Sequence, residues 1–410
     1  MAIVKPFRGY RPAAHAKQIS CPPYDVINSQ EAREMAAGNA LSFLHVEKPE
    51  IDLPESVNLY DAQVYAKGKE NLEKFIAQGI LKQDDKPCFY IYAQTMSGRT
   101  QYGLVAAVSA EEYDRGIIRR HELTRKDKEE DRTRHVDTLS ATTGPVFLTY
   151  PDNAQMDKIV AGICAGHPAY AFTTPDGIGH VLWVVSDNKV IDDIIRIFAR
   201  LPILYIADGH HRSASAANVA RKRKAANPHH TGTENYNFFQ AVIFPSSQLY
   251  IMDYNRLVKD LNGFSQQDFI KKIGEKFYVL PTGKAKPSVR HEFGMYLGGQ
   301  WYTLKAKAGT FNEQNPVDAL DVSILQKNLL GPVLGIGDPR TDKRISFVGG
   351  IRGLNELKKR VDSGAYRVAF SMYPTSIGEL MKVADARLIM PPKSTWFEPK
   401  LRSGLVVYKY

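Results

Sequence analysis

The sequence predicts a mixed α/β fold of the α+β type, because short apolar strands alternate with helical segments along the whole chain. Two clear hairpins, at 88–108 and 294–305, have MSGR and Gly-Gly as their turns. A third observation is an apolar strand at 203–207 that passes through a glycine-containing turn into a helix over 213–226. The chain has no internal repeat or low-complexity tract, so we expect compact domains.

The elements of the first 258 residues follow from periodicity and turn residues. Two prolines make SCPPYDVI an ordered loop at 20–27. Apolar spacing predicts helices over 59–80, 119–135, 194–201 and 213–226. Apolar runs predict strands at 88–94, 101–108, 145–150, 180–185, 203–207, 238–244 and 249–254.

Beyond residue 258 the composition changes little, but helices alternate with hairpins. Here we expect a hairpin at 294–305, a strand at 345–350, and helices over 318–330 and 376–385. The change of pattern predicts a soft boundary near 255–265. It divides the chain into an N-terminal α/β region, 1–258, and a C-terminal α+β region, 259–410.

The composition is that of an ordinary globular chain, with 410 residues of which 43% are hydrophobic and 24% charged. Three widely separated cysteines exclude a disulfide scaffold and a local CxxC site, and they favour a reducing cytoplasm. No apolar run approaches the roughly 18 residues that span a bilayer. The N-terminal MAIVKPFRGYRP lacks the apolar core of a signal peptide. We therefore expect a cytoplasmic protein without a membrane partner.

The chain is basic, since 54 Lys and Arg against 44 Asp and Glu give a net charge of +10. Such a surplus suits nucleic acid, an acidic surface or a small phosphorylated substrate, and equally a solvated basic surface. The RKRK run at 221–224 has no interleaved aromatic residues and lies at a predicted helix end, where cations complement the dipole. Nucleic acid is therefore not an expected partner.

The sharpest local pattern is ADGHHRS at 207–213, where an apolar strand turns into a helix. Such a turn leaves unpaired N–H groups at a helix N-terminus, which attracts anions. His211 can donate a proton near neutral pH, and Asp208 can bind Mg²⁺ or accept a proton. The alternative is an ordinary capped helix with solvated histidines. The residues that we expect to hold phosphate are Gly209, His210, Arg212 and Ser213.

The second pattern is the charged stretch IIRRHELTRKDKEEDRTRHVDTLSATTGP at 117–145. If it is helical, Glu122–Lys126 and Lys128–Arg132 fall at i,i+4, and an exposed ion-paired helix is one interpretation. The other is a functional site, because the carboxylate of Glu122 could act as a base among groups that bind anions or substrate. Those groups are Arg120, His121 and Arg125.

Two proline-bearing loops supply further candidates for contacts with a substrate. PPYDVI at 22–27 could place Tyr24 and Asp25 at a pocket rim, or it could simply pack. MPPKSTWFEPKLRSG at 390–404 could close over a site or cover a core edge, and Lys393 is its candidate for substrate binding.

Several enzyme classes lack their motifs in this chain. It contains no HExxH, no GxSxG, no GxGxxG after a strand and no clustered Cys/His spacing. The side chains of His210 and His211 diverge on a helix or strand, so they cannot easily bind one metal together. A zinc hydrolase is therefore disfavoured.

Four ordered motifs resemble those of the bacterial and archaeal family known as domain of unknown function 1015, over nearly the whole chain. They are PPYDVI, RRHELTRKDKEEDR, ADGHHR and MPPKSTWFEPKLRSGL. More remotely, the DGHHR turn resembles the nucleotide-binding signature of the ParB/sulfiredoxin-like superfamily, which includes free L-serine kinases. This resemblance implies a ParB/sulfiredoxin-like core elaborated by a second α+β region. It also implies that Glu122 is the base, and that phosphate and metal are bound by Asp208, Gly209, His210, His211 and Arg212.

Together these features predict a small-molecule kinase that transfers a phosphoryl group from ATP or ADP, with Mg²⁺, to a hydroxyl of a compact metabolite such as free L-serine. We expect Glu122, His211 and Asp208 to be catalytic, with Asp208 also a metal ligand. The alternatives are a nucleotide-responsive ParB-like regulatory protein and a phosphoester hydrolase. The sequence is compatible with a homo-oligomer, and it leaves open whether Glu122 and the DGHHR turn share one site.

Overall fold

The computed structural model describes residues 2–281 and 284–410. Its contacts divide the chain into two units. The first contains the chain up to Leu249 together with Pro399–Tyr410, and the second is Tyr250–Glu398. The division lies ahead of the boundary predicted after residue 258. The C-terminal segment also returns to the first unit, which no local sequence pattern indicates.

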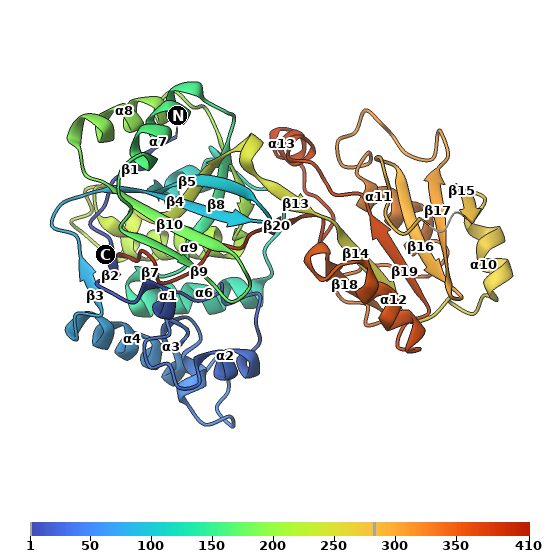
Figure 1. Cartoon of the computed structure of the whole chain (residues 1–410), viewed down its shortest axis with the longest axis horizontal. Helices are drawn as coiled ribbons and strands as arrows, with labels where there is room; N and C mark the ends of the chain where they lie inside the picture. The colour runs from blue at the N-terminus through green and yellow to red at the C-terminus, as the bar shows by residue number, and fades with distance from the viewer. Residues whose placement is uncertain (1, 282–283) are drawn as a thin grey trace. The chain divides into compact units, whose positions relative to one another are not determined.

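A nine-stranded mixed sheet forms the centre of the first unit (Figure 1). Its strands are β1 (Val4–Lys5), β4 (Phe89–Met96), β5 (Arg99–Ser109), β6 (Ile118–Arg119), β8 (Val146–Tyr150), β9 (Tyr170–Thr173), β10 (Gly179–Val185), β11 (Leu204–Asp208) and β12 (Phe238–Pro245). Their order is β6-β11-β8-β12-β5-β4-β10-β9, and β1 pairs with β5. The β6–β11 and β8–β12 pairs are parallel, and the other pairs are antiparallel. Two small pairs join β2 (Tyr10–Pro12) to β3 (Leu81–Gln83), and β7 (Ala141–Thr142) to β21 (Tyr408–Lys409).

Helices cover this sheet. They are α1 (Ala16–Ile19), α2 (Ser29–Ala36), α3 (Leu44–Glu47), α4 (Ala62–Ala77), α5 (Ala110–Asp114), α6 (Lys126–Leu139), α7 (Ala154–Cys164), α8 (Asn188–Phe198) and α9 (His210–Ala226). Figure 1 shows α7 and α8 on one side of the sheet and α6 and α4 on the other, and α6 packs beside α9. Buried residues such as Phe89, Leu148, Ile206 and Ile243 form the main core. A second core includes Phe43, Leu72, Phe75 and Leu139.

The second unit is built on a six-stranded antiparallel sheet. Its strands, in spatial order, are β15 (Phe277–Pro281), β17 (Gln300–Ala306), β16 (Glu292–Leu297), β19 (Val368–Met372), β14 (Tyr254–Val258) and β18 (Ile345–Gly349). The strands β13 (Tyr250–Met252) and β20 (Trp396–Glu398) form a separate pair. The helices are α10 (Gln266–Ile273), α11 (Asp321–Leu325), α12 (Leu354–Asp362) and α13 (Ile377–Asp385), and α11 continues as a π-helix over Gln326–Leu330.

The prediction of a mixed α/β fold is confirmed, and both predicted hairpins are present as β4–β5 and β16–β17. Ser97 and Gly98 both have positive φ in the first turn, as a tight hairpin turn requires. The helix predicted over 59–80 is α4, which begins after Asp61, whose side chain accepts a hydrogen bond from the backbone N–H of Gln63. The strand predicted at 249–254 is instead split between β13 and β14.

The helix predicted over 119–135 is the main error in secondary structure. Arg119 pairs with Tyr205 in the parallel β6–β11 ladder, and residues 120–125 form a loop before α6 begins at Lys126. Glu122 and Lys126 are therefore not an i,i+4 pair on one helix, whereas Lys128 and Arg132 do share α6. The spacing of charged residues alone cannot distinguish a helix from a loop whose position is fixed because the strand before it pairs with a strand far away in sequence.

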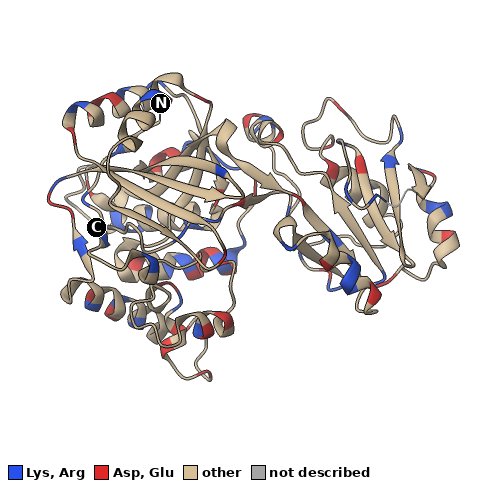
Figure 2. Ribbon diagram, viewed as in Figure 1, with Lys and Arg blue, Asp and Glu red and all other residues tan. Residues whose placement is uncertain are grey.

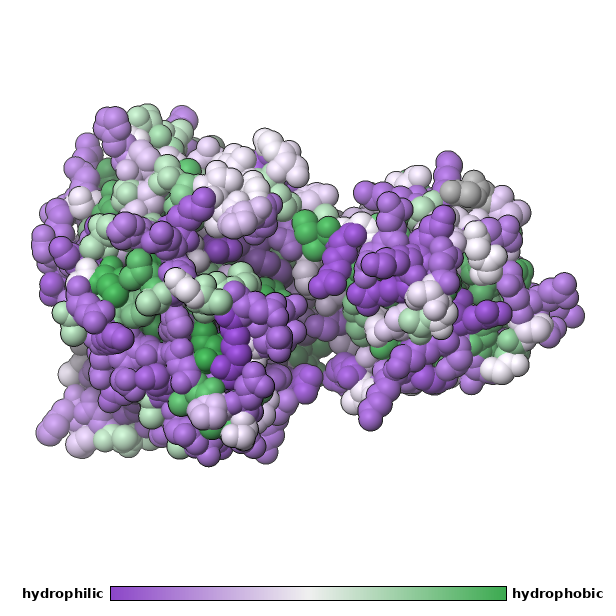
Figure 3. Space-filling view, turned by 60° about the horizontal axis from the view of Figure 1, so that its bottom comes forward, coloured by the Kyte–Doolittle hydropathy of each residue, from purple (hydrophilic) through white to green (hydrophobic). Residues whose placement is uncertain are grey.

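Charged residues of both signs are interleaved along the helices of each unit (Figure 2). On the face seen in Figure 3, hydrophobic residues form only small patches, and these lie among hydrophilic residues. None of the helices within the described ranges combines the length and apolar character that crossing a bilayer requires.

Candidate functional site

Two parallel strands bring the charged loop and the DGHHR turn together. In the β6–β11 ladder, Ile118 lies opposite Leu204 and Arg119 opposite Tyr205. The carboxyl ends of parallel strands meet at one edge of a sheet, so the segments that follow them emerge side by side. One segment is the loop at 120–125 and the other is the turn into α9. Glu122 and the turn therefore share one site.

The turn that follows β11 leads directly into the start of a long helix, α9. Gly209 has φ of 93°, in the left-handed region, and a Cβ there would lie 3.5 Å from the Cα of Val146. Among the residues that the structure describes, no side chain caps this 17-residue helix. The N–H groups of its first turn, and the positive end of its dipole, are thus placed to bind an anion.

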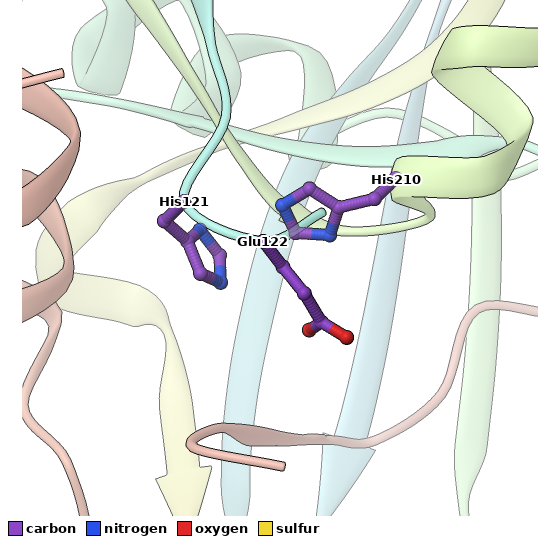
Figure 4. A group of neighbouring side chains, drawn as sticks. All are labelled: His121, Glu122 and His210. Atoms are coloured by element: carbon purple, nitrogen blue, oxygen red, sulfur yellow. The ribbon is translucent and has the colours of Figure 1, made fainter. Parts of the chain in front are cut away.

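His121, Glu122 and His210 converge at this turn (Figure 4). Each offers one ligand atom, and these atoms lie within 4.8 Å of one another. The rings of His121 and His210 are perpendicular, with centroids 4.5 Å apart. The two histidines are only 1% and 7% exposed. Both ring nitrogens of His121, and Nε2 of His210, make no hydrogen bond within the described part of the chain.

Burial keeps this histidine pair neutral. It lowers the pKa of His121 to about 4, a shift that the nearby carboxylate of Asp208 partly opposes. The pKa of His210 is also far below the ordinary value, first because of burial and then because of His121. Both rings are therefore uncharged near neutral pH and can use a nitrogen lone pair to bind a proton donor or a cation.

His211 has a hydrogen-bond partner outside this pair. Its Nε2 accepts a hydrogen bond of 3.0 Å from the backbone N–H of Arg125. Burial lowers the pKa of His211. Because a backbone N–H can only donate, the neutral ring carries its proton on Nδ1, which is left as a donor. The two consecutive histidines thus belong to different parts of the site, as the divergence of their side chains predicts.

Asp208 is engaged by two donors. Its Oδ1 accepts a hydrogen bond from the N–H of Gly209 at 2.7 Å, and its Oδ2 lies 2.8 Å from Nζ of Lys400. After the opposing effect of burial, the Lys400 ammonium is the main cause that holds the pKa of this carboxyl well below its usual range. The sequence predicts a site role for Lys393 and none for Lys400. The ammonium group blocks close approach of a second cation to Oδ2, so Asp208 is poorly suited to be a primary Mg²⁺ ligand.

Arg212 connects the turn to two other loops. Its guanidinium donates to both carboxylate oxygens of Asp25, at 2.9 and 3.1 Å, and to the carbonyl of Pro145 at 2.9 Å. Two guanidinium groups lie over the ring of Tyr24, that of Arg132 at 4.1 Å and that of Arg212 at 5.4 Å from its centroid. The Tyr24–Asp25 loop thus contacts the first turn of α9, and the terminal nitrogens of Arg212 already donate to protein acceptors.

Arg212 lines a cavity of about 30 Å³. Among its lining residues, Glu47 Oε1, Arg212 Nε and Gln240 Oε1 are buried and make no hydrogen bond within the described ranges. A Cβ on Gly144 would come within 3.2 Å of Glu47 Oε1. These three polar atoms and the size of the cavity suit ordered water. Glu47 and Gln240 come from segments that carried no motif, so sequence reasoning missed them.

The other predicted site residues have varied surroundings. The Ser213 hydroxyl is fully buried and donates to the carbonyl of Gly209 within its own helix. Arg120 lies over the ring of Tyr113. The side chain of Arg125 bonds to Asp127. Lys393 belongs to the second unit, where its ammonium lies over the Tyr254 ring at 5.7 Å.

Lys400→Met is expected to lower the free energy of unfolding of the first unit by about 1–3 kcal/mol at pH 7, because it leaves the Asp208 carboxylate without its charged partner. The folded pKa of Asp208 lies below the unfolded value of about 3.9, so the stabilisation is present above that pH and is lost as the pH falls through the folded pKa. Urea unfolding at pH 7 and in acid checks both points. The matched variant Lys393→Met should leave the first unit unchanged, and equal losses in both variants would contradict the assignment.

Comparisons with known proteins add the following. The family model described as "Protein of unknown function (DUF1015)" matches residues 4–323. No curated protein matches the chain. Similar solved structures include a conserved hypothetical protein from Pyrococcus furiosus, at 13% identity and a TM-score of 0.35, covering 73% of this chain and 93% of that one. A free serine kinase in complex with AMP has 12% identity and a TM-score of 0.36, and the match covers 72% of this chain and 86% of that one. SbnI with C-terminal truncation from Staphylococcus aureus has 12% sequence identity and a TM-score of 0.36, and the match covers 72% of this chain and 82% of that one. Likenesses this low carry no argument about activity.

Proposed function

Because the chain belongs to the DUF1015 family, whose description assigns no function, we propose an activity from the geometry of its own site: it is a nucleotide-dependent kinase of a small hydroxyl compound. The donor is ATP or ADP, and the acceptor is a compact metabolite such as free L-serine. One observation carries the proposal. The Glu122 carboxylate lies within 4.8 Å of a ring nitrogen of His210, at the uncapped start of α9.

The site brings together the parts that phosphoryl transfer needs. The reaction depends mainly on positioning and on neutralising the charge of the phosphate oxygens. The first-turn N–H groups of α9 and the Nδ1–H of His211 would donate hydrogen bonds to these oxygens. The ammonium of Lys400 adds positive charge beside Asp208 at the same turn.

Glu122 is the proposed base. Its carboxylate would accept the proton of the substrate hydroxyl, whose oxygen then forms a bond to the terminal phosphorus of the nucleotide. The bond from that phosphorus to the bridging oxygen breaks, and the nucleotide leaves with one phosphate fewer. General-base assistance of this kind requires the carboxylate and the phosphate site to lie within hydrogen-bond reach of one substrate, which the shared edge of β6 and β11 makes possible.

Mg²⁺ would enter this site bound to the phosphates of the nucleotide more readily than as an ion held by the Asp208 carboxylate. Mg²⁺ prefers oxygen ligands and commonly binds substrate phosphates together with one or two carboxylates. Both oxygens of Asp208 accept hydrogen bonds, one of them from an ammonium group. When bound to the nucleotide, Mg²⁺ would neutralise phosphate charge.

The experiment is incubation of the purified chain with ATP or ADP, MgCl₂ and a panel of hydroxyl compounds led by L-serine. We expect a phosphorylated acceptor, detected by ³¹P NMR and mass spectrometry, to form in step with loss of the nucleotide's terminal phosphate. Release of inorganic phosphate with every acceptor would instead indicate a hydrolase. Nucleotide binding without any turnover would indicate a regulatory protein, and either result would contradict the kinase.

A further inference from the structure

We infer that His121, Glu122 and His210 form a binding site for a borderline divalent metal ion such as Mn²⁺, Co²⁺ or Zn²⁺. The inference rests on the convergence of three donor side chains, two of which are buried histidines that each have a ring nitrogen without a hydrogen bond to the described residues. It deepens the proposed function, because it identifies a second cation at the same site. Metal binding by these side chains does not, however, depend on turnover.

The donor set indicates the class of metal. Two imidazole nitrogens and one carboxylate oxygen suit manganese, iron, cobalt or zinc, whereas Mg²⁺ takes oxygen ligands almost alone. Ligands about 2.0–2.2 Å from a common ion can be at most about 4.4 Å apart. The separations here are within 4.8 Å, so small rotations of the side chains would close the shell. Three protein ligands leave further coordination positions for a substrate or for water.

The burial of the two histidines is the second argument. His121 has both ring nitrogens buried without a hydrogen bond in the described chain, and His210 has its Nε2 in the same condition. A buried polar atom left without a hydrogen bond lowers the stability of the fold. A bound cation would supply the missing partner.

The backbone positions the three proposed ligand residues before any metal ion binds. His121 and Glu122 follow β6, while His210 opens α9 directly after β11 and Gly209. Because β6 and β11 are hydrogen-bonded to each other, both ligand segments are anchored to one sheet. Charge around the site is mixed: the Asp208 carboxylate favours a cation, and Arg120 opposes it.

A metal here is compatible with the proposed role of Glu122. A carboxylate has two oxygens, so one can bind the ion while the other remains available to accept a proton. The same chain could therefore use both Mg²⁺ carried by the nucleotide and a resident metal held by histidine.

The test measures metal binding alone, with untagged, chelator-treated protein and neither nucleotide nor acceptor. Titration with Co²⁺, followed by its visible absorption and by calorimetry, should show one equivalent bound, with bands typical of nitrogen ligands. His121→Gln, His210→Gln and Glu122→Gln should each weaken the affinity by about tenfold or more. A millimolar excess of Mg²⁺ should not displace the ion. His167→Gln and His229→Gln, at exposed histidines, are matched controls and should bind as wild type does.

Each outcome bears on one proposal. Absence of stoichiometric Co²⁺, binding that all three ligand variants retain, or ready displacement by Mg²⁺ would overturn the metal site. Glu122→Gln keeps the inference testable if a buried histidine variant does not fold, since Glu122 is only half-buried. Phosphoryl transfer without Co²⁺ binding would support the kinase and refute the metal site. Tight Co²⁺ binding without any phosphoryl transfer would support the metal site and contradict the kinase.

Discussion

Glu122→Gln is expected to lower kcat for phosphoryl transfer by about 10²–10⁴-fold, because the amide cannot accept the proton of the substrate hydroxyl. Nucleotide affinity should change little, since the proposed phosphate donors lie on α9 and not on Glu122. The measurement is initial-rate kinetics with the best acceptor, together with nucleotide titration by calorimetry. A fall in kcat with a retained nucleotide Kd is the result that a base predicts.

Glu130→Gln is the matched control for this substitution. Glu130 lies on α6, is half-exposed and pairs with Lys126, so its loss should leave kcat unchanged. Both variants should be assayed with Mg²⁺ alone and again with saturating Co²⁺, because Glu122 is also a proposed metal ligand. If Glu122→Gln retains wild-type turnover under both conditions, Glu122 is not the base.

Arg212→Ala is expected to lower the free energy of unfolding of the first unit by about 2–3 kcal/mol. The substitution removes the bonds to Asp25 and Pro145 and the guanidinium over Tyr24. Asp25 is 38% exposed, so water partly solvates its carboxylate after the change, and the loss should stay below that of a fully buried pair. The loop that carries Tyr24 should also exchange its amide protons faster.

The fluorescence of Trp183 can follow this unfolding, since it is buried in the first unit and the other two tryptophans, Trp301 and Trp396, belong to the second. Replacing those two by Phe isolates the signal. Arg221→Ala is the control, because Arg221 lies on the same helix and pairs with Asp114 at the surface, where an ion pair contributes less than about 1 kcal/mol. Equal losses in Arg212→Ala and Arg221→Ala would show that Arg212 does not anchor the loop.

Local patterns were enough to predict most of the secondary structure. A hairpin turn such as Ser97-Gly98 is indicated by two residues and their neighbours in sequence. A helix is indicated by the spacing of apolar residues within a few consecutive turns. The two-residue strand β6 left no such pattern, because Ile118–Arg119 is a strand only through its pairing with Leu204–Tyr205. For that reason the sequence predicts a helix where the structure has the loop that carries Glu122.

Candidate residues were found where a motif concentrates unusual chemistry. The DGHHR turn and the HELTR loop were both selected from sequence, and the structure places Glu122 against His210. The choice between Lys393 and Lys400 could not be made in this way. Both lie in one proline-bearing segment, yet they fall in different units, and only Lys400 reaches Asp208.

By itself, then, the sequence determined the mixed α/β class, the strand–turn–helix at Asp208–His210 and the residue types available for chemistry, since these depend on periodicity and on short-range backbone geometry. The tertiary structure alone decided that β6 pairs in parallel with β11, that the C-terminal segment returns to the first unit, and that His121, Glu122 and His210 converge. Those arrangements depend on pairing between segments far apart in the chain, which no local pattern encodes.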